Sequence, residues 1–329
     1  MWLKLKEWAD EYGPIYQTRA MGQTFIIISD ETIAEELLVK GGHIYSGRLQ
    51  IRSLIRHKEG QAYLALMDRL DRHDTWQKQR KWQLQKGGTG LLEQEDDQEV
   101  FASCMLDFLN LVGVVTISGP LKFFQMAMAL QPSWQQRAQA EIDRVCGARM
   151  PTTADFASLP TVRGCLKETL RWRSTVPLGV PHQAERDDVF RGVTIKKNTT
   201  VLPCEWSLNH ISHCYSGYPD PDSFRPERYL EPGWPTYMAP LSRYPNFREG
   251  ASMHSFGWGR RTCLGKDFVD DELFVCGAAM LWGLKLAQKR CPLTGKNVPN
   301  DTQATNSHVI LEPSPFEMSI QPRTDSQQL

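Results

Sequence analysis

The residues best suited to chemistry lie in one short stretch, FGWGRRTCLG at positions 256–265, which runs directly into an apolar segment with helical periodicity. Cys263 is its candidate reactive group. We expect a helix to begin one residue later, and the unpaired N–H groups of a helix N-terminus stabilise a thiolate over a thiol. Gly259 and Gly265 lack side chains, so a flat ligand and the helix backbone can come close to the loop. Arg261 can hold an anionic group.

A single thiolate narrows the choice of metal centre. Structural zinc needs about four protein ligands, whereas one axial thiolate is what a haem needs to split O–O bonds. The pattern F-x-x-G-x-R-x-C-x-G resembles the cysteine loop of the cytochrome P450 family, the haem-thiolate monooxygenases. The resemblance implies haem b, with Cys263 as the axial iron ligand and with Phe256, Gly259, Arg261 and Gly265 as cofactor-binding residues. The alternative is a Gly-rich turn around a buried free cysteine.

Other residues match the family's contacts to the haem carboxylates. Trp76 and Arg80 form a W-x-x-x-R pattern, and on a helix residues four apart share a face. In the family this pair meets a haem propionate, and a further propionate contact falls at the position of His182. The alternatives are a half-buried Trp beside a surface Arg and an exposed His that follows a Pro in a loop.

A long apolar helical pattern over residues 97–130, with a kink expected at Pro120, resembles the family's central helix. The family's G-x-[D/E]-T motif aligns with Gly113 to Thr116. The resemblance implies that Gly113 makes room for oxygen and that the Thr116 hydroxyl delivers protons to the reacting oxygen. Val115 stands where the family has its acid. A mid-helix Thr ordinarily bonds its own backbone, so Thr116 keeps that alternative.

Glu168 and Arg171 form an E-x-x-R pattern, which places both charges on one helix face. An exposed ion pair of this kind contributes under about 1 kcal/mol. The FRPERY stretch that contains Arg228 resembles the family's P-E-R-F segment. The resemblance implies a structural ion-pair network of Glu168, Arg171 and Arg228, in which a buried charge is paired because an unpaired one is very costly.

The chain departs from the family after Arg80. A polar, Gly-containing linker near 81–96 stands where the family has many helices of the substrate pocket and its lid. The fold implied is mainly α with a smaller β part (α+β), of cytochrome P450 type and internally truncated. We expect one haem-thiolate domain over 1–329. Its β-rich part would comprise about 14–60 and 176–206. Its helical haem-binding part would comprise about 61–175 and 207–291.

Local patterns outside the motifs predict the remaining elements. They predict a helix at 2–12, strands at 15–20, 24–28, 188–190, 193–195 and 199–204, and helices at 133–145, from Pro160 and at 269–286. Asp30 is the expected N-cap of a helix that runs to about Lys40. Residues 44–48 resemble the family's N-terminal part, and we assign them no chemistry.

Composition limits the partners and the compartment. The formal net charge is zero, so no basic excess is available for nucleic acid. Eight scattered cysteines without a C-x-x-C pair indicate a reducing compartment. The most apolar run, 108–121, is too short to cross a bilayer, and no signal peptide or anchor is expected in this chain. The sequence as written indicates a soluble or peripheral intracellular protein. The resemblance, to a fungal microsomal type, implies a membrane surface on the cytoplasmic side of the endoplasmic reticulum.

The function implied is insertion of one oxygen atom from O2 into an apolar small-molecule substrate, in secondary metabolism. Because the chain has no dinucleotide fingerprint, NADPH would supply electrons through a separate flavoprotein reductase. Two alternatives stay open. The first is a truncated, non-catalytic haem-binding remnant. The second is a haem-thiolate dehydratase or isomerase, which Val115 favours because such chemistry needs no relay acid.

Overall fold

The computed structural model describes residues 1–20, 22–48, 114–210, 220–234, 237, 255–263, 265–306 and 310–323. The described residues divide into two compact units. The first unit comprises the described residues of 1–114, 177–214 and 256–266, and the second those of 115–176, 215–255 and 267–329. Each unit brings together segments that are far apart in the sequence, so neither is a continuous stretch of chain.

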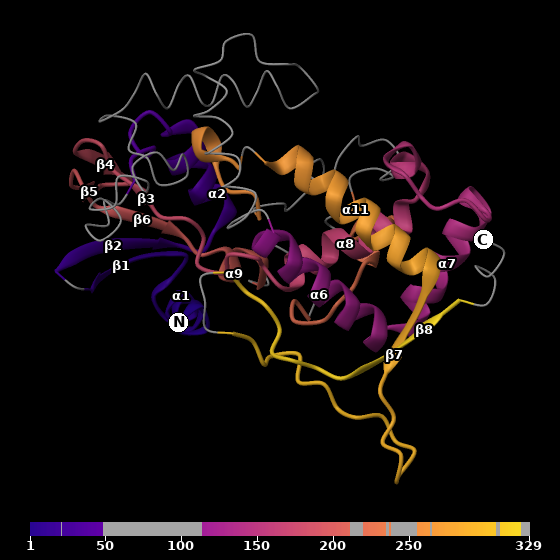
Figure 1. Cartoon of the computed structure of the whole chain (residues 1–329). Helices are drawn as coiled ribbons and strands as arrows, with labels where there is room; N and C mark the ends of the chain where they lie inside the picture. The colour runs from indigo at the N-terminus through magenta and orange to yellow at the C-terminus, as the bar shows by residue number, and fades with distance from the viewer. Residues whose placement is uncertain are drawn as a thin grey trace, which may run out of the picture. The chain divides into compact units, whose positions relative to one another are not determined.

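The first unit contains a mixed four-stranded sheet of order β1-β2-β6-β3 (Figure 1). Its strands are β1 (Ile15–Ala20), β2 (Gln23–Ile28), β6 (Thr200–Pro203) and β3 (His182–Gln183). The predicted hairpin is confirmed, with Ile15 opposite Ile28 in the antiparallel pair β1–β2. Strand β6 runs parallel to β2, and β3 runs antiparallel to β6. A separate predicted hairpin, β4 (Asp188–Phe190) with β5 (Val193–Ile195), is also confirmed.

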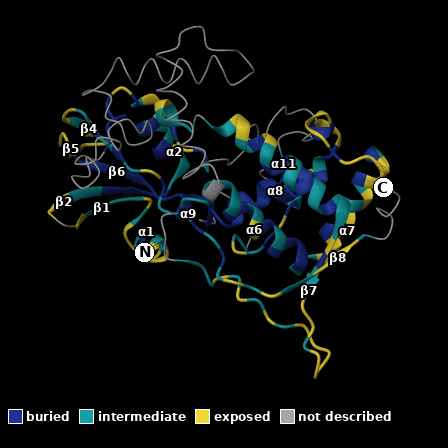
Figure 2. Ribbon diagram, in the orientation of Figure 1, coloured by how far each residue is buried: buried dark blue, intermediate teal, exposed yellow. Residues whose placement is uncertain are grey.

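Helices of the first unit surround this sheet's apolar residues. Helix α1 (Trp2–Tyr12) packs against α9 (Glu205–His210). Asp30 caps α2 (Glu31–Ala34) by accepting from the Ile33 N–H at 2.9 Å, and α2 continues into the π-helix η1 (Glu35–Lys40). The predicted cap and helix end are therefore confirmed. The core of this unit gathers buried residues from β2, α2, η1 and β6 (Figure 2).

The second unit is mainly helical (Figure 1). Its elements are α6 (Val114–Leu130), α7 (Pro132–Cys146), the 3-10 helix η4 (Thr153–Ser158), α8 (Pro160–Trp172), α10 (Glu227–Leu230), α11 (Lys266–Gly283), β7 (Leu284–Gln288) and β8 (Met318–Pro322). Helix α8 begins at Pro160 as predicted. Every α8 residue after Pro160 is buried, including its charged ones (Figure 2). The α+β class predicted from the sequence is confirmed by the described elements.

One predicted element is wrong at its end. The apolar pattern predicted a helix over 269–286, but α11 ends at Gly283 and the chain continues as β7. Strand β7 pairs antiparallel with β8, with Leu284 opposite Pro322. The Gln135 side chain accepts from the Leu286 N–H and donates to the Leu286 carbonyl, so it acts as a second partner for the strand. These partners lie far away in the sequence, which is why local periodicity missed the strand.

Among the helices of the described ranges, none is both long enough and apolar enough to span a bilayer. The six cysteines within those ranges are free thiols. They include Cys263 on its loop and Cys291 near the end of the chain.

Two left-handed glycines of the first unit differ in their surroundings and give a matched test. Gly179 has φ of +72°, and a Cβ there would overlap the Pro203 carbonyl oxygen, whereas Gly192 has φ of +84° with open space around it. Gly192→Ala should cost about 1–2 kcal/mol of unfolding free energy, the cost of a left-handed L-residue. Gly179→Ala should cost roughly 1–3 kcal/mol more, because the overlap forces backbone to move.

Urea unfolding of both variants measures this difference. Equal losses of stability would contradict the close approach of Gly179 to β6.

Candidate cofactor site

The loop around Cys263 is a tight turn closed by its own backbone. The Cys263 N–H donates to the Phe256 carbonyl at 2.7 Å, and the Thr262 N–H donates to the Gly259 carbonyl at 3.2 Å. The 3-10 turn η6 (Gly259–Arg261) lies within the loop. Helix α11 begins at Lys266, two residues later than predicted, and Gly265 lies in the turn before it. Cys263 is partly exposed. It lies in a hydrogen-bonded turn just before the N-terminus of α11.

Neighbours on both sides hold the loop in place. Gly259 has φ of +51°, and a Cβ there would overlap the Leu38 carbonyl oxygen of η1. Glycine is therefore needed for the loop to approach η1. On the other side, the buried indole of Trp258 donates through Nε1 to Glu205 Oε1 of α9 at 3.2 Å. The sequence predicted that Gly259 allows a close approach, and the observed close neighbour is the backbone of η1.

Three basic side chains of the first unit are held by backbone carbonyls near the loop. Arg261 Nε donates to the Ser46 carbonyl at 2.8 Å. Arg48 Nη1 donates to the Pro181 carbonyl at 2.7 Å. His182 Nδ1 lies 2.8 Å from the Tyr45 carbonyl, so Nδ1 carries a proton and donates it.

We refer to Arg48, His182 and Arg261 as the basic cluster. Burial first, and then the positive charge of Arg261, lower the pKa of Arg48 to about 9. Burial, and then Arg48, with a smaller contribution from Arg261, lower the pKa of His182 to about 3, against the hydrogen bond to Tyr45. Arg48 and Arg261 therefore repel each other in a poorly solvated place, while His182 stays neutral near pH 7, and a bound anion would relieve that repulsion.

The residues present fit a haem. One partly exposed thiol offers the axial ligand, and the basic cluster offers donors to carboxylates within the same compact unit. Arg–carboxylate pairs are among the stronger hydrogen-bonded contacts in proteins. Within the described residues no group of three or more His, Cys, Asp or Glu side chains is placed to hold a metal ion.

Arg48 is the residue that sequence reasoning missed. The stretch 44–48 was assigned no chemistry, yet the structure places Arg48 beside His182 and Arg261. Gly47 forms an isolated antiparallel bridge with Gln183, which brings Arg48 to the edge of the sheet next to β3. The available signal was an Arg directly after a Ser-Gly pair, which alone is too common to assign.

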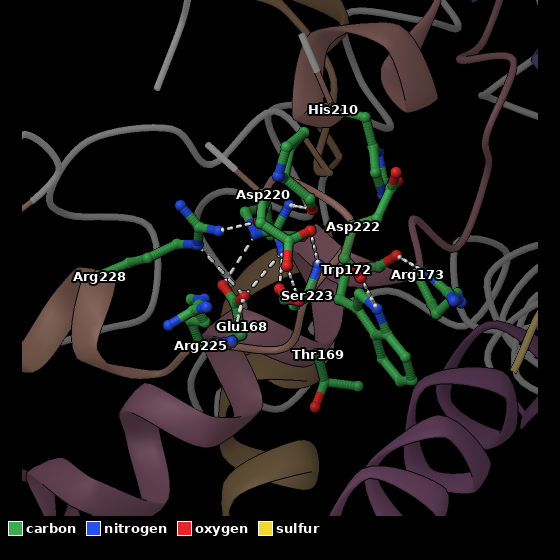
Figure 3. A network of polar contacts seen from close by, with 12 residues as sticks. Glu168, Thr169, Trp172, Arg173, His210, Asp220, Asp222, Ser223, Arg225 and Arg228 are labelled. Atoms are coloured by element: carbon green, nitrogen blue, oxygen red, sulfur yellow. Dashed lines mark hydrogen bonds and ion pairs between the residues drawn. The ribbon is translucent and has the colours of Figure 1, made fainter. Parts of the chain in front are cut away.

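In the second unit Glu168, Arg171 and Arg228 form the network implied by the resemblance (Figure 3). Glu168 accepts from Arg171 Nε at 2.8 Å and from Arg171 Nη2 at 2.7 Å. Arg228 Nε lies 3.4 Å from Glu168 Oε1, and the Arg225 backbone N–H donates to the same oxygen at 2.8 Å. The side chains of Glu168, Arg171 and Arg228 have no solvent exposure, so this is a buried network.

Side chains of α8 and α10 also hydrogen-bond to the backbone carbonyls of the loop 220–223. Arg228 Nη2 donates to the carbonyl of Asp220, and Arg171 donates to the carbonyls of Pro221 and Ser223, at 2.7–3.0 Å. Trp172 Nε1 donates to the Asp222 carbonyl at 2.7 Å (Figure 3). Each successive carbonyl is thus held by a side chain from α8 or α10, so the network shapes a loop that has no secondary structure of its own.

The remaining predicted residues are placed only in part. Thr116 is half-buried near the start of the described part of α6, in the second unit. Trp76, Arg80, Gly113 and the linker 81–96 lie outside the described residues, as does the side chain of Val115. Their roles therefore stay predictions.

Comparisons with known proteins bear on the whole chain. The family model described as Cytochrome P450 matches residues 1–112 and 91–319. A cytochrome P450 monooxygenase of Armillaria gallica is 34% identical over 213 residues, 64% of this chain and 39% of that protein. The cytochrome P450 monooxygenase iboC of Amanita muscaria is 31% identical over 265 residues, 68% of this chain and 47% of that protein. The chain thus spans less than half the length of these relatives.

Solved structures support the same fold. A zebrafish cytochrome P450 structure with abiraterone aligns with a TM-score of 0.75 and 19% identity, over 98% of this chain and 99% of that chain. The structure with progesterone aligns with a TM-score of 0.73 and 18% identity, over the same shares.

The buried network predicts a large cost for one substitution. Glu168→Gln should lower the free energy of unfolding by about 3–5 kcal/mol, because it leaves buried arginine charge uncompensated. Glu7→Gln breaks the solvent-exposed pair with Lys4 and should leave stability unchanged within error. Urea unfolding at neutral pH measures both. A Glu168→Gln chain as stable as wild type would show that the network contributes little.

The basic cluster predicts loss of stability in acid. A His whose folded pKa is lowered below its unfolded value stabilises the fold above the unfolded pKa, and this stability is lost as pH falls. For His182 the window runs from about 6.5 down to about 3. His182→Gln keeps a donor for Tyr45 but cannot take up a proton, so it should lose less stability across this window than wild type does.

Urea unfolding between those pH values measures the slope, with exposed His43→Gln as the matched control, which should follow wild type. Identical slopes for His182→Gln and wild type would contradict a buried, neutral His182.

Proposed function

Because the chain belongs to the cytochrome P450 family, we propose that it binds haem b through the Cys263 thiolate and acts as a haem-dependent monooxygenase. Its substrate would be an apolar small molecule that receives one oxygen atom from O2. The chain covers 39% and 47% of two monooxygenase relatives, so the activity of the whole protein is part of this proposal.

One observation carries the proposal: Cys263 lies on a backbone-closed loop two residues after Arg261, and Arg261 lies close enough to the buried Arg48 for the two charges to repel. A thiolate ligand and a carboxylate-binding cluster are the two things that a haem requires of its protein. If Cys263 were only a packed structural cysteine, the unfavourable proximity of Arg48 and Arg261 would have no purpose. A bound haem carboxylate gives it one.

The chain's own residues have separable tasks in this proposal. Arg48 and Arg261 bind and orient the haem carboxylates, and the anion in turn relieves their mutual repulsion. His182 already donates its Nδ1 proton to Tyr45, so it must take up a proton at Nε2 to donate a second bond. A neighbouring carboxylate raises the pKa of His182 and favours that uptake.

When bound, haem with a thiolate ligand supplies O2 activation by two electrons and favours O–O cleavage. The protein supplies the ligand, the carboxylate contacts and a proton path. We assign the Thr116 hydroxyl to that path because of its place in the helix motif, with Gly113 making room beside it. Val115 removes the usual relay acid, so Thr116 would hand on protons that ordered water provides.

The partners follow from the family. NADPH would supply electrons through a separate flavoprotein reductase, at the cytoplasmic face of the endoplasmic reticulum, and the product would belong to secondary metabolism. The relatives from Armillaria gallica and Amanita muscaria, both named cytochrome P450 monooxygenases, support the fungal type of this assignment.

A second function is favoured by one observation. Val115 replaces the relay acid, which dehydration or isomerisation at a haem-thiolate centre does not need.

A non-catalytic haem-binding remnant is a separate alternative. It is consistent with the short length of the chain relative to its relatives. Haem binding without turnover would identify the remnant, and turnover without O2 consumption would identify the dehydratase or isomerase.

Thiolate ligation is tested by reconstitution of the full chain with haem, reduction and addition of carbon monoxide. Wild type should give the strongly red-shifted Soret band of thiolate-ligated haem, and Cys263→Ser should lose it. Cys291→Ser is the matched control, because Cys291 is another free thiol outside the loop, and it should keep the band.

Oxygen consumption with a flavoprotein reductase and NADPH then measures monooxygenation. Failure of the wild-type chain to retain haem would overturn both the monooxygenase and the dehydratase or isomerase assignments.

A further inference from the structure

Glu205 is a buried carboxyl group with an unusual environment. It is the first residue of α9 and is 4% exposed. Its Oε1 accepts from Trp258 Nε1 at 3.2 Å, and its Oε2 is buried without a hydrogen-bond partner among the described residues. Trp258 is itself 5% exposed and lies five residues before Cys263. The cysteine loop is therefore tied to α9 by one side-chain hydrogen bond.

The surroundings of Glu205 favour a neutral acid. Burial raises the pKa of Glu205 well above its usual value, and the Trp258 hydrogen bond opposes this only in part. The N-terminus of a helix favours a carboxylate, but α9 has only six residues and that effect is correspondingly weak. An isolated carboxylate in an apolar setting is very costly, so the group neutralises instead.

In the part of the chain that the structure describes, the ionisable groups around Glu205 do not supply a counter-charge. Cys204 precedes it, and burial raises the pKa of that thiol, with a further increase from Glu205. On α1, which packs against α9, Lys4 pairs with Glu7 and Lys6 pairs with Asp10 at the surface. In the loop, Arg260 is exposed and Arg261 donates to Ser46. None of these charges contributes to the pKa of Glu205.

Trp258 occupies a position from which it can hold the whole loop. It belongs to the apolar core of the first unit, together with Leu38 of η1 and Leu208 of α9. The next residue, Gly259, lies against the η1 backbone. A shift of the indole would therefore move the turn that carries Arg261 and Cys263, because these residues follow directly in the chain.

We propose that Glu205 is a positioning residue for the cysteine loop: its buried carboxyl accepts the Trp258 indole N–H, and ionisation of this carboxyl releases the loop. The inference rests on the proposed function, because the released element carries the haem ligand. Ionisation places an uncompensated charge in the core, and the fold relieves it by admitting water between α9 and the loop. The expected result is loss of thiolate ligation as pH rises.

Substitutions at Glu205 separate its acceptor role from its ionisation. Glu205→Gln keeps an oxygen acceptor for Trp258 and cannot ionise. Glu205→Leu removes the acceptor and also cannot ionise. Glu141→Gln is the matched control, because Glu141 is another partly buried carboxyl with a raised pKa, but it caps α8 through Thr161 in the second unit.

The first measurement uses the full chain with haem, reduced and bound to carbon monoxide. The red-shifted Soret band is followed as pH rises. In Glu205→Gln the midpoint pH for loss of the band should move up by about 1 pH unit or more, since no group ionises at that position. Glu205→Leu should lose part of the band at every pH, and Glu141→Gln should keep the wild-type midpoint. A Glu205→Gln midpoint equal to that of wild type would overturn the proposal.

The second measurement needs no haem and separates this inference from the proposed function. A carboxyl whose folded pKa is raised stabilises the fold below its unfolded pKa of about 4.3, and that stability is lost as pH rises. The unfolding equilibrium constant of wild type should rise relative to Glu205→Gln by up to about tenfold per pH unit above that value. A ratio that stays constant with pH would overturn the proposal.

A wild-type chain that shows this pH-dependent ratio but retains no haem would overturn the proposed function, while the protonated state of Glu205 in the fold would stand. A chain that retains haem but shows a ratio that stays constant with pH would overturn the inference about Glu205, while the proposed haem binding would stand.

Discussion

A charge that leaves water has to meet an opposite charge or a full set of hydrogen bonds, and the second unit is arranged around one such charge. The Glu168 carboxylate is fully buried; it accepts hydrogen bonds from Arg171 and from the Arg225 backbone N–H, and it forms an ion pair with Arg228. The arginines then use their other N–H groups on the carbonyls of residues 220–223. One buried charge on α8 thereby fixes the path of a distant loop that has no hydrogen-bonded ladder of its own.

In the first unit the charges concerned are positive. Arg48 and Arg261 bring two positive charges close together beside the buried, neutral His182, and backbone carbonyls satisfy part of the hydrogen-bonding capacity of all three. Such a cluster is stable at neutral pH because His182 stays uncharged, and it becomes more stable when an anion binds. Glu205 completes the pattern, since burial keeps this acid neutral beside the loop that carries Cys263. Protonation state thus sets the geometry on both sides of the cysteine loop.

The agreement between sequence and structure was closest where a local pattern acts alone. The β1–β2 hairpin, the Asp30 cap and the start of α8 at Pro160 follow from alternation, capping and turn chemistry within a few residues. Strand β7 did not follow, because its partners are β8 and Gln135, which lie far away in the chain. Arg48 was missed for a similar reason. It is of interest because it lies near His182 and Arg261 in space, and no sequence pattern indicates that proximity.

The sequence by itself indicated the family and singled out Cys263 as the candidate ligand, because the cysteine loop combines several residue types at short range. The E-x-x-R helix and the later arginine were likewise visible as a pattern. Only the tertiary structure decided which charges are buried, which carbonyls they hold and which acid lies behind the loop. Burial depends on every element that packs around a side chain, and it changes the cost of a charge by far more than any neighbour in the sequence does.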